Sequence, residues 1–153
     1  MLRVISEVLE FVPTGHQTRI EPVIDFLNHV THRKCVVFMI SDYIAGEGFM
    51  RPLTVTGRRH DVVSIIFGDN HEESLPRVGL LEWHDLETGE RFLIDTSNSL
   101  TRRRFTSLQA QRRDNLLNKL KRMSIDTVEI NAADKDYDKA FVKFFRMRAA
   151  RSR

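Results

Sequence analysis

The chain has 153 residues, of which 41% are hydrophobic and 29% are charged, and these values are typical of a single globular domain. No apolar run is long enough for a membrane-spanning helix, and the N-terminus lacks a secretory signal pattern, so we expect a cytoplasmic protein without membrane contact. The single cysteine, Cys35, excludes an internal disulfide and a thiolate zinc site, and the formal net charge of +3 is too small to indicate nucleic-acid binding.

The first half of the chain predicts helices that alternate with buried strands. Residues 2–11 repeat apolar side chains over a wide helical face, which predicts a well-buried helix, and residues 20–31 predict a second helix. Residues 35–40 form a continuous apolar run, which predicts a strand buried on both faces, and residues 62–67, apolar apart from Ser64, predict a second buried strand. A short helix is predicted between them at residues 49–59. This alternation predicts parallel strands joined by helical crossovers.

The second half predicts a hairpin, a long helix, a third strand and a final helix. Residues 79–95 contain two short strands on either side of Gly89, which can adopt the positive φ of a tight reversal. A long basic helix at residues 98–123 would turn five side chains toward the core: Phe105, Leu108, Leu116, Leu120 and Met123. A strand at 126–130 precedes a helix with an aromatic face formed by Tyr137, Ala140, Phe141, Phe144 and Phe145. We expect one domain over residues 1–150 and a frayed tail at 151–153.

Charge is segregated between the hairpin region and the long helix. Residues 71–95 hold seven acidic residues against two basic ones, whereas residues 99–123 hold eight basic residues against one acidic residue. One hypothesis is a contact surface for a protein partner, formed by Arg102, Arg103, Arg104, Arg112, Arg113, Glu87 and Glu90. The leading alternative is a nucleic-acid-binding module in which the same arginines contact phosphates. No aromatic residues interleave with these arginines to stack bases, which favours the protein partner.

Six short strings in chain order resemble a known bacterial family. They resemble the von Willebrand factor A-like proteins classed as domain of unknown function fifty-eight, which are commonly encoded beside MoxR-type AAA+ ATPases. The strings are Gly15-His-Gln-Thr18-Arg-Ile20, Val37-Phe-Met-Ile-Ser-Asp42-Tyr, Arg59-His-Asp-Val-Val63, Glu73-Ser-Leu-Pro-Arg-Val-Gly-Leu80, Asp85-Leu-Glu-Thr-Gly-Glu90 and Ile94-Asp-Thr-Ser97. The resemblance implies an α/β, Rossmann-like three-layer sandwich in which this chain forms the latter half of a von Willebrand factor A-like domain, with a β-hairpin inserted at about residues 79–95.

The same resemblance implies a site for Mg²⁺ or Mn²⁺ at the carboxyl ends of the strands. Thr18 and Asp42 match two of its ligands, while its Asp-x-Ser-x-Ser motif and the opening strands are expected upstream of Met1. Two oxygen side chains cannot fill a six-coordinate site, so we expect no cofactor in this segment unless that motif is supplied. The string from Asp95 to Ser99 also spells Asp-x-Ser-x-Ser, but it follows a short hairpin strand and precedes a helix. We therefore predict that Asp95 and Ser97 cap the helix and bind no metal.

The resemblance and the absence of a catalytic motif together predict a non-enzymatic protein-interaction domain. By resemblance, its partner would be a MoxR-type AAA+ ATPase that assembles or remodels other bacterial proteins. The sequence has no Gly-x-Ser-x-Gly nucleophile elbow and no phosphate-binding glycine loop. A third hypothesis is a metal-dependent hydrolase or nuclease built around Asp42 and Asp61. Because half of the sheet would be missing, we also expect an unpaired strand edge and self-association.

Overall fold

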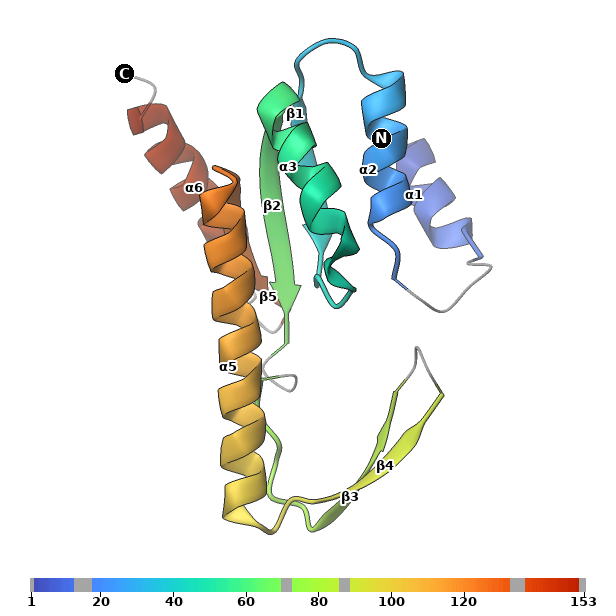
Figure 1. Ribbon diagram of the computed structural model, residues 1–153, viewed down its shortest axis with the longest axis vertical. Helices are drawn as coiled ribbons and strands as arrows, with labels where there is room; N and C mark the ends of the chain where they lie inside the picture. The colour runs from blue at the N-terminus through green and yellow to red at the C-terminus, as the bar shows by residue number, and fades with distance from the viewer. Residues whose placement is uncertain (1, 13–17, 70–72, 86–88, 133–136, 152–153) are drawn as a thin grey trace.

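The computed structural model describes residues 2–12, 18–69, 73–85, 89–132 and 137–151, and it contains two separate sheets (Figure 1). The larger sheet has three parallel strands in the order β1–β2–β5, which are β1 (Val36–Ser41), β2 (Asp61–Gly68) and β5 (Asp126–Asn131). The smaller sheet pairs β3 (Leu80–His84) with β4 (Arg91–Asp95) in antiparallel orientation. The predicted α/β class, the parallel pairing and the hairpin are confirmed.

One face of the parallel sheet is covered by four helical elements. They are α2 (Glu21–Val30), the 3₁₀ turn η1 (Glu47–Phe49), α3 (Met50–Arg59) and the C-terminal half of α5 (Ser99–Arg122). Their buried side chains form one apolar cluster with the sheet: Ile20, Ile24, Tyr43, Phe49, Leu53, Val62, Ile66, Leu120 and Ile125. This cluster is the larger of two buried clusters among the described residues.

The opposite face of the sheet is covered by α6 (Tyr137–Arg151), which lies mainly over β5 and β2. Phe144 packs there against Val63 and Ile65 of β2 and against Val128 and Ile130 of β5. The helix continues to Arg151, the first residue of the tail that was expected to fray, and residues 152–153 lie outside the described part.

Strand β1 corrects the expectation of a strand buried on both faces. Its side chains alternate between half-buried and exposed, and Val36, Phe38 and Ile40 are 56%, 47% and 64% exposed. These three residues lie on the α6 side of the sheet, but α6 stops short of covering them. A continuous apolar run predicts a strand with two apolar faces, and only the placement of neighbouring helices decides whether both faces are covered.

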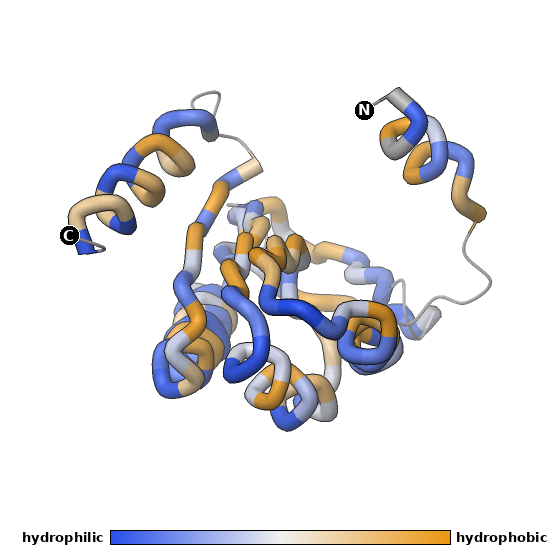
Figure 2. Tube along the Cα trace, turned by 90° about the horizontal axis from the view of Figure 1, so that it is seen from above, coloured by the Kyte–Doolittle hydropathy of each residue, from blue (hydrophilic) through white to orange (hydrophobic). Residues whose placement is uncertain are grey.

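Helix α1 (Leu2–Glu10) forms where it was predicted, but the expectation that it is well buried is wrong. Its apolar residues Ile5, Val8 and Leu9 are exposed, and the helix stands apart from the remaining elements (Figure 2). Helical spacing creates an apolar stripe without specifying what packs on it. None of the helices in the described ranges has a stretch long and apolar enough to span a bilayer.

The hairpin is joined rigidly to the start of α5. Thr96 is fully buried, its hydroxyl donates to the Gly79 carbonyl at 2.6 Å, and it accepts from the Val78 N–H at 3.0 Å. Trp83 of β3 lies against Phe105 of α5 with 5.7 Å between ring centroids. Gly89 has a φ of +75°, as the predicted reversal requires.

The core-facing stripe predicted for α5 is correct only in part. Leu120 is fully buried, and Leu116 and Met123 pack against the same cluster. Leu108 is 60% exposed instead, because the helix meets the parallel sheet only near its C-terminal end and its N-terminal half extends beyond the sheet (Figure 1). Arg112, which interrupts the predicted stripe, is exposed for the same reason.

Replacing Thr96 by Val tests the junction between the hairpin and α5. Valine keeps the shape of threonine but removes both hydroxyl hydrogen bonds, so we expect the free energy of unfolding to fall by about 1–2 kcal/mol. Urea unfolding followed by the fluorescence of Trp83, the single tryptophan of the chain, would measure this loss at the hairpin itself.

The matched control is Thr106→Val on the exposed surface of α5, where we expect almost no change. Equal unfolding midpoints for Thr96→Val and the unsubstituted chain would contradict the role given to this hydroxyl.

Candidate functional site

The carboxyl end of β1 forms a tight turn that holds Asp42 at the edge of the sheet. The Asp42 Oδ1 accepts from the Ile44 N–H at 3.0 Å, and the Tyr43 N–H donates to the Ser41 hydroxyl at 3.0 Å. Tyr43 has a φ of +57°, which a residue with a side chain adopts at an energetic cost. Asp42 itself is exposed, so its carboxylate can meet a partner from solvent.

Tyr43 anchors this turn in the core. Its ring is buried against Phe49, with 5.7 Å between centroids, and its hydroxyl accepts from the fully buried Ser64 hydroxyl at 2.6 Å. Burial raises the pKa of the Tyr43 phenol above its ordinary value, an effect that the Ser64 hydrogen bond partly offsets. The strained backbone at Tyr43 is therefore stabilised by packing and by a hydrogen bond to the central strand.

Thr18 lies on the loop that leads into α2 and is exposed. The N-cap of α2 is Ile20, so Thr18 is not its capping residue. Ile20 and Tyr43 belong to the same buried cluster, so the Thr18 loop and the Asp42 turn both border that cluster. One hydroxyl and one carboxylate do not fit the octahedral oxygen shell of Mg²⁺ or Mn²⁺, and the described residues contain no group of three or more acidic, His or Cys side chains positioned for a metal.

Asn98 caps α5, which corrects the prediction for Asp95 and Ser97. The Asn98 Oδ1 accepts from the Leu100 N–H at 2.9 Å, whereas the Asp95 Oδ1 accepts from the Ser97 N–H at 2.9 Å and so closes the preceding turn. The helix thus begins within this string, as expected, but its capping residue is Asn98, one position after Ser97.

The five arginines of the predicted partner surface have different roles. Arg102 donates to the carbonyls of Thr96 and Ser97, and Arg113 forms ion pairs with Glu129 at 2.7 Å and with Glu73. These two arginines are engaged by other residues of the fold. Arg103, Arg104 and Arg112 are exposed and have no hydrogen-bond or ion-pair partner among the described residues.

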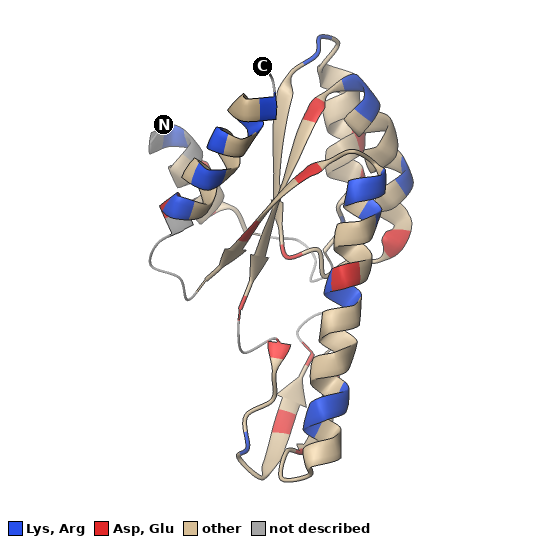
Figure 3. Ribbon diagram, turned by 90° about the vertical axis from the view of Figure 1, so that its left-hand side faces the viewer, with Lys and Arg blue, Asp and Glu red and all other residues tan. Residues whose placement is uncertain are grey.

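The acidic half of the predicted partner surface is only partly described. Glu90 is exposed beside the hairpin reversal, while Glu87 lies outside the described residues. Glu82 of β3 forms an ion pair with Arg91 of β4 at 3.3 Å, so one acidic charge of the hairpin is paired within the hairpin itself. Figure 3 shows basic residues along α5 and acidic residues on the hairpin beside its N-terminal half.

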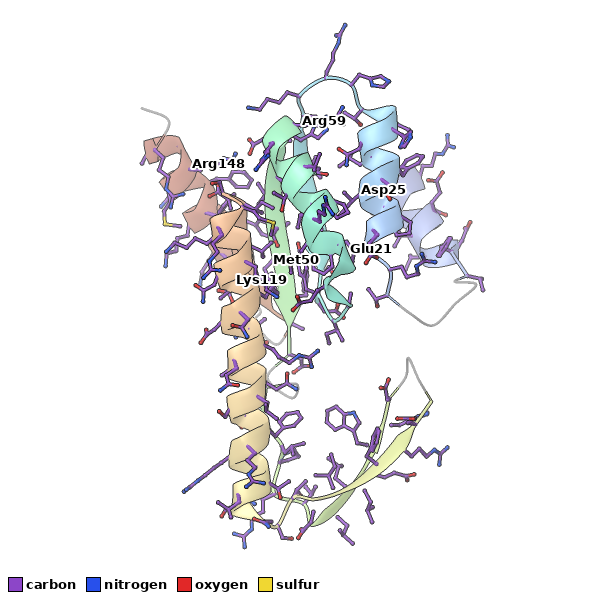
Figure 4. The ribbon with its side chains drawn as sticks, viewed as in Figure 1. Glu21, Asp25, Met50, Arg59, Lys119 and Arg148 are labelled. Atoms are coloured by element: carbon purple, nitrogen blue, oxygen red, sulfur yellow. The ribbon has the colours of Figure 1, made fainter. Side chains whose placement is uncertain are left out.

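The structure separates Asp42 and Asp61, the centre of the hydrolase hypothesis. The strands are parallel, and the register pairs Asp61 with Val36 and Ile66 with Ser41, so the two aspartates lie at opposite ends of the sheet. At about 3.3 Å per residue, they are roughly 20 Å apart. Asp61 is engaged by Arg148 of α6 (labelled in Figure 4), which also pairs with Asp126 at 3.8 Å.

The sequence predicted an unpaired strand edge, but not the partly uncovered surface beside β1, here called the β1 apolar face and formed by Val36, Phe38 and Ile40 of β1 and Phe145 of α6. Phe145 of α6 meets Phe38 edge-to-face with ring centroids 6.4 Å apart, and both rings remain half exposed. The strand order places β1 at the edge of the sheet, so its outer backbone groups have no neighbouring strand among the described residues. The apolar run at residues 35–40 was the sequence feature that could have indicated this surface, because exposed edge strands rarely consist of apolar residues alone.

Replacing Tyr43 by Phe tests the anchor of the Asp42 turn. The change leaves the buried Ser64 hydroxyl without its partner, and we expect a loss of about 1–2 kcal/mol in unfolding free energy near neutral pH. Because the raised pKa keeps the folded phenol protonated, the unfolded chain releases its proton first, and the stability contributed by Tyr43 falls as pH rises above about 10. Urea unfolding at pH 8 and at pH 10.5 would measure both effects.

The double variant Tyr43→Phe with Ser64→Ala is the control for this hydrogen bond. If the two hydroxyls act as a pair, the two losses will not add. Additive losses, or an unchanged pH dependence in Tyr43→Phe, would contradict the assignment.

Comparison with known proteins places the chain among uncharacterized bacterial relatives. It is 33% identical over 97 residues to uncharacterized proteins of Mycobacterium bovis and Mycobacterium tuberculosis, which covers 62% of this chain and 30% of each relative. An uncharacterized protein of Mycobacterium avium is 32% identical over 85 residues, which covers 54% of this chain and 50% of that relative. No solved structure matches the chain significantly.

The chain thus spans half or less of the length of the curated relatives that it matches. A family model matches residues 1–115, from α1 through the exposed part of α5. The chain belongs to the family described as Protein of unknown function DUF58.

Proposed function

We propose that this chain is a non-enzymatic protein-interaction domain whose main contact surface is the edge of β1 together with the β1 apolar face. The observation that carries the proposal is the exposure of Val36, Phe38 and Ile40 on an edge strand of an otherwise buried parallel sheet. Strands of parallel sheets are ordinarily covered on both faces, and contiguous exposed apolar patches mark interaction surfaces.

The backbone of β1 determines how a partner would bind. An extended segment of another protein can add a strand to an open edge, so that main-chain hydrogen bonds supply affinity and side-chain pockets supply specificity. The β1 apolar face lies beside that edge, with Phe38 and Phe145 as aromatic anchors. Aromatic residues in well-packed positions commonly carry most of the binding energy of an interface.

The resemblance to von Willebrand factor A-like proteins supports a more specific form of this proposal. The order β1–β2–β5, with helices on both faces, agrees with one half of a doubly wound sheet, and Asp42 follows the carboxyl end of a strand, where such folds bind ligands. By the same resemblance, the protein would act in the bacterial cytoplasm with a MoxR-type AAA+ ATPase during assembly or remodelling of other proteins. A Mg²⁺ or Mn²⁺ ion at Thr18 and Asp42 would need oxygen ligands from outside this chain, and the proposal does not depend on one.

Replacing Ile40 by Lys tests the β1 surface. A charged lysine on an edge strand opposes the addition of another strand, and the exposed position of Ile40 means that the fold itself should tolerate the change. We expect binding to a purified MoxR-type ATPase from the same genome, and concentration-dependent self-association, each to weaken about tenfold. Sedimentation velocity would measure both.

Val23→Lys on α2 is the matched control, since Val23 is equally exposed but lies on the other side of the sheet. If the two variants behave alike, the β1 surface is not the contact site. If the unsubstituted chain binds no ATPase, the proposed partner is wrong.

A further inference from the structure

The N-terminal half of α5 presents a second surface, separate from β1. The helix has 24 residues and is about 36 Å long at 1.5 Å per residue. Its contacts with the core of the parallel sheet are made by Leu116, Leu117 and Leu120, near its C-terminal end. In the same region, Lys119 of α5 forms an ion pair with Glu47 of η1 at 2.5 Å. Among the described residues, the first turns of α5 contact the hairpin through Phe105 and the segment before the helix through Arg102.

Four residues from the start of α5 to just past its middle form a stripe along the helix, here called the α5 stripe. Leu100, Arg104, Leu108 and Arg112 recur at intervals of four, so each lies about one turn further along the helix and about 40° around it from the one before. Leu100 and Leu108 are both 60% exposed, and Arg104 and Arg112 are exposed without a partner among the described residues. Leucine and arginine thus alternate on a surface that nothing in the described structure covers.

The α5 stripe differs from an ordinary solvated helix face. Of the other arginines on this helix, Arg102 and Arg113 are held by hydrogen bonds or ion pairs within the fold. The outward residues Leu80 and Leu93 of the hairpin, and Val78 before it, are also more than half exposed. This lobe therefore combines exposed large apolar residues with unpaired arginines, the mixture that favours protein interfaces over plain solvation.

We propose that the α5 stripe binds an amphipathic helix of a partner protein whose exposed face alternates apolar and acidic residues. A helix laid along α5 would place its carboxylates near Arg104 and Arg112 at the same four-residue pitch, and its apolar side chains against Leu100 and Leu108. This inference rests on the proposed interaction function and gives the partner's chemistry at a second surface.

Nucleic acid is the competing occupant of these arginines, and the leucines distinguish the two. Phosphate binding depends on positive charge and is indifferent to an exposed leucine side chain, and the α5 stripe has no aromatic residue on which a base could stack. A helical peptide would lose affinity when either the charge or the apolar contact is removed.

The experiment measures fluorescence anisotropy of a labelled synthetic helical peptide with Leu and Glu alternating at four-residue spacing on one face. Binding to the full chain is compared with binding to the variants Arg104→Glu, Arg112→Glu and Leu108→Ser. We expect each arginine variant to weaken binding about tenfold and Leu108→Ser to weaken it about fivefold. Circular dichroism would verify that the helices are retained.

Arg103→Glu is the matched control. Arg103 is equally exposed and unpaired among the described residues, but it lies about 100° around the helix from Arg104, about 140° from Leu108 and about 180° from Arg112, so Leu100 is its one neighbour in the stripe. We expect this change to alter peptide affinity less than twofold, whereas a diffuse charge effect would weaken binding as much as Arg104→Glu does.

Three results would overturn the inference. The first is that the labelled peptide shows no binding when the protein is in 100-fold molar excess over it, and the second is that Arg103→Glu weakens peptide binding as much as Arg104→Glu does. The third result is that a random-sequence DNA duplex binds more tightly than the peptide and that Leu108→Ser does not change the affinity for DNA. If any of these results is obtained while Ile40→Lys still weakens ATPase binding, the α5 stripe is not a binding site, but the proposed function is unaffected. If the peptide binds as expected but Ile40→Lys has no effect on ATPase binding, the β1 contact surface is wrong and the α5 stripe is supported.

Discussion

Burial of β2 between two parallel partners is the constraint on which the rest of the structure depends. Its residues from Val62 to Ile66 are buried and alternate between the two apolar clusters, so one strand supplies the centre of both. Every hydrogen-bonding group of such a strand must be satisfied by its neighbours because water is excluded. β1 and β5 meet that requirement, and the helices then cover the apolar surface that the three strands leave.

The same constraint explains why β1 is the most exposed strand of the sheet. One edge of β1 forms backbone hydrogen bonds with β2, and the other edge has no neighbouring strand among the described residues. Its carboxyl end is nevertheless held firmly, because Tyr43 reaches back to Ser64 on β2 and fixes the Asp42 turn. A fixed strand end, an edge without a neighbouring strand among the described residues and half-exposed aromatic rings occur together, which is the combination expected of a preorganised binding surface.

The hairpin and the N-terminal half of α5 lie outside the parallel sheet and stabilise each other. A two-stranded sheet is barely stable by itself, so the hairpin depends on Thr96, on the contact between Trp83 and Phe105, and on Arg102 at the helix start. These contacts keep α5 helical well beyond the sheet that anchors its other end. The segregated charge of this region is therefore divided: part of it stabilises the lobe, and part remains available to a partner.

Local patterns in the sequence determined the positions of the helices and strands, the parallel pairing, the hairpin reversal at Gly89 and the start of α5, because each follows from spacing or turn chemistry within a few residues. The placement of Asp42 at a strand end was also predictable for this reason. Burial was not predictable in the same way: one face of β1, the described apolar side chains of α1 and Leu108 were expected to be buried and are exposed. The roles of the arginines were equally hidden, since Arg102 and Arg113 differ from Arg104 and Arg112 only in what lies across from them. An apolar stripe or a charge is a property of the local chain, whereas its burial or pairing depends on which distant elements pack beside it, and only the tertiary structure decides that.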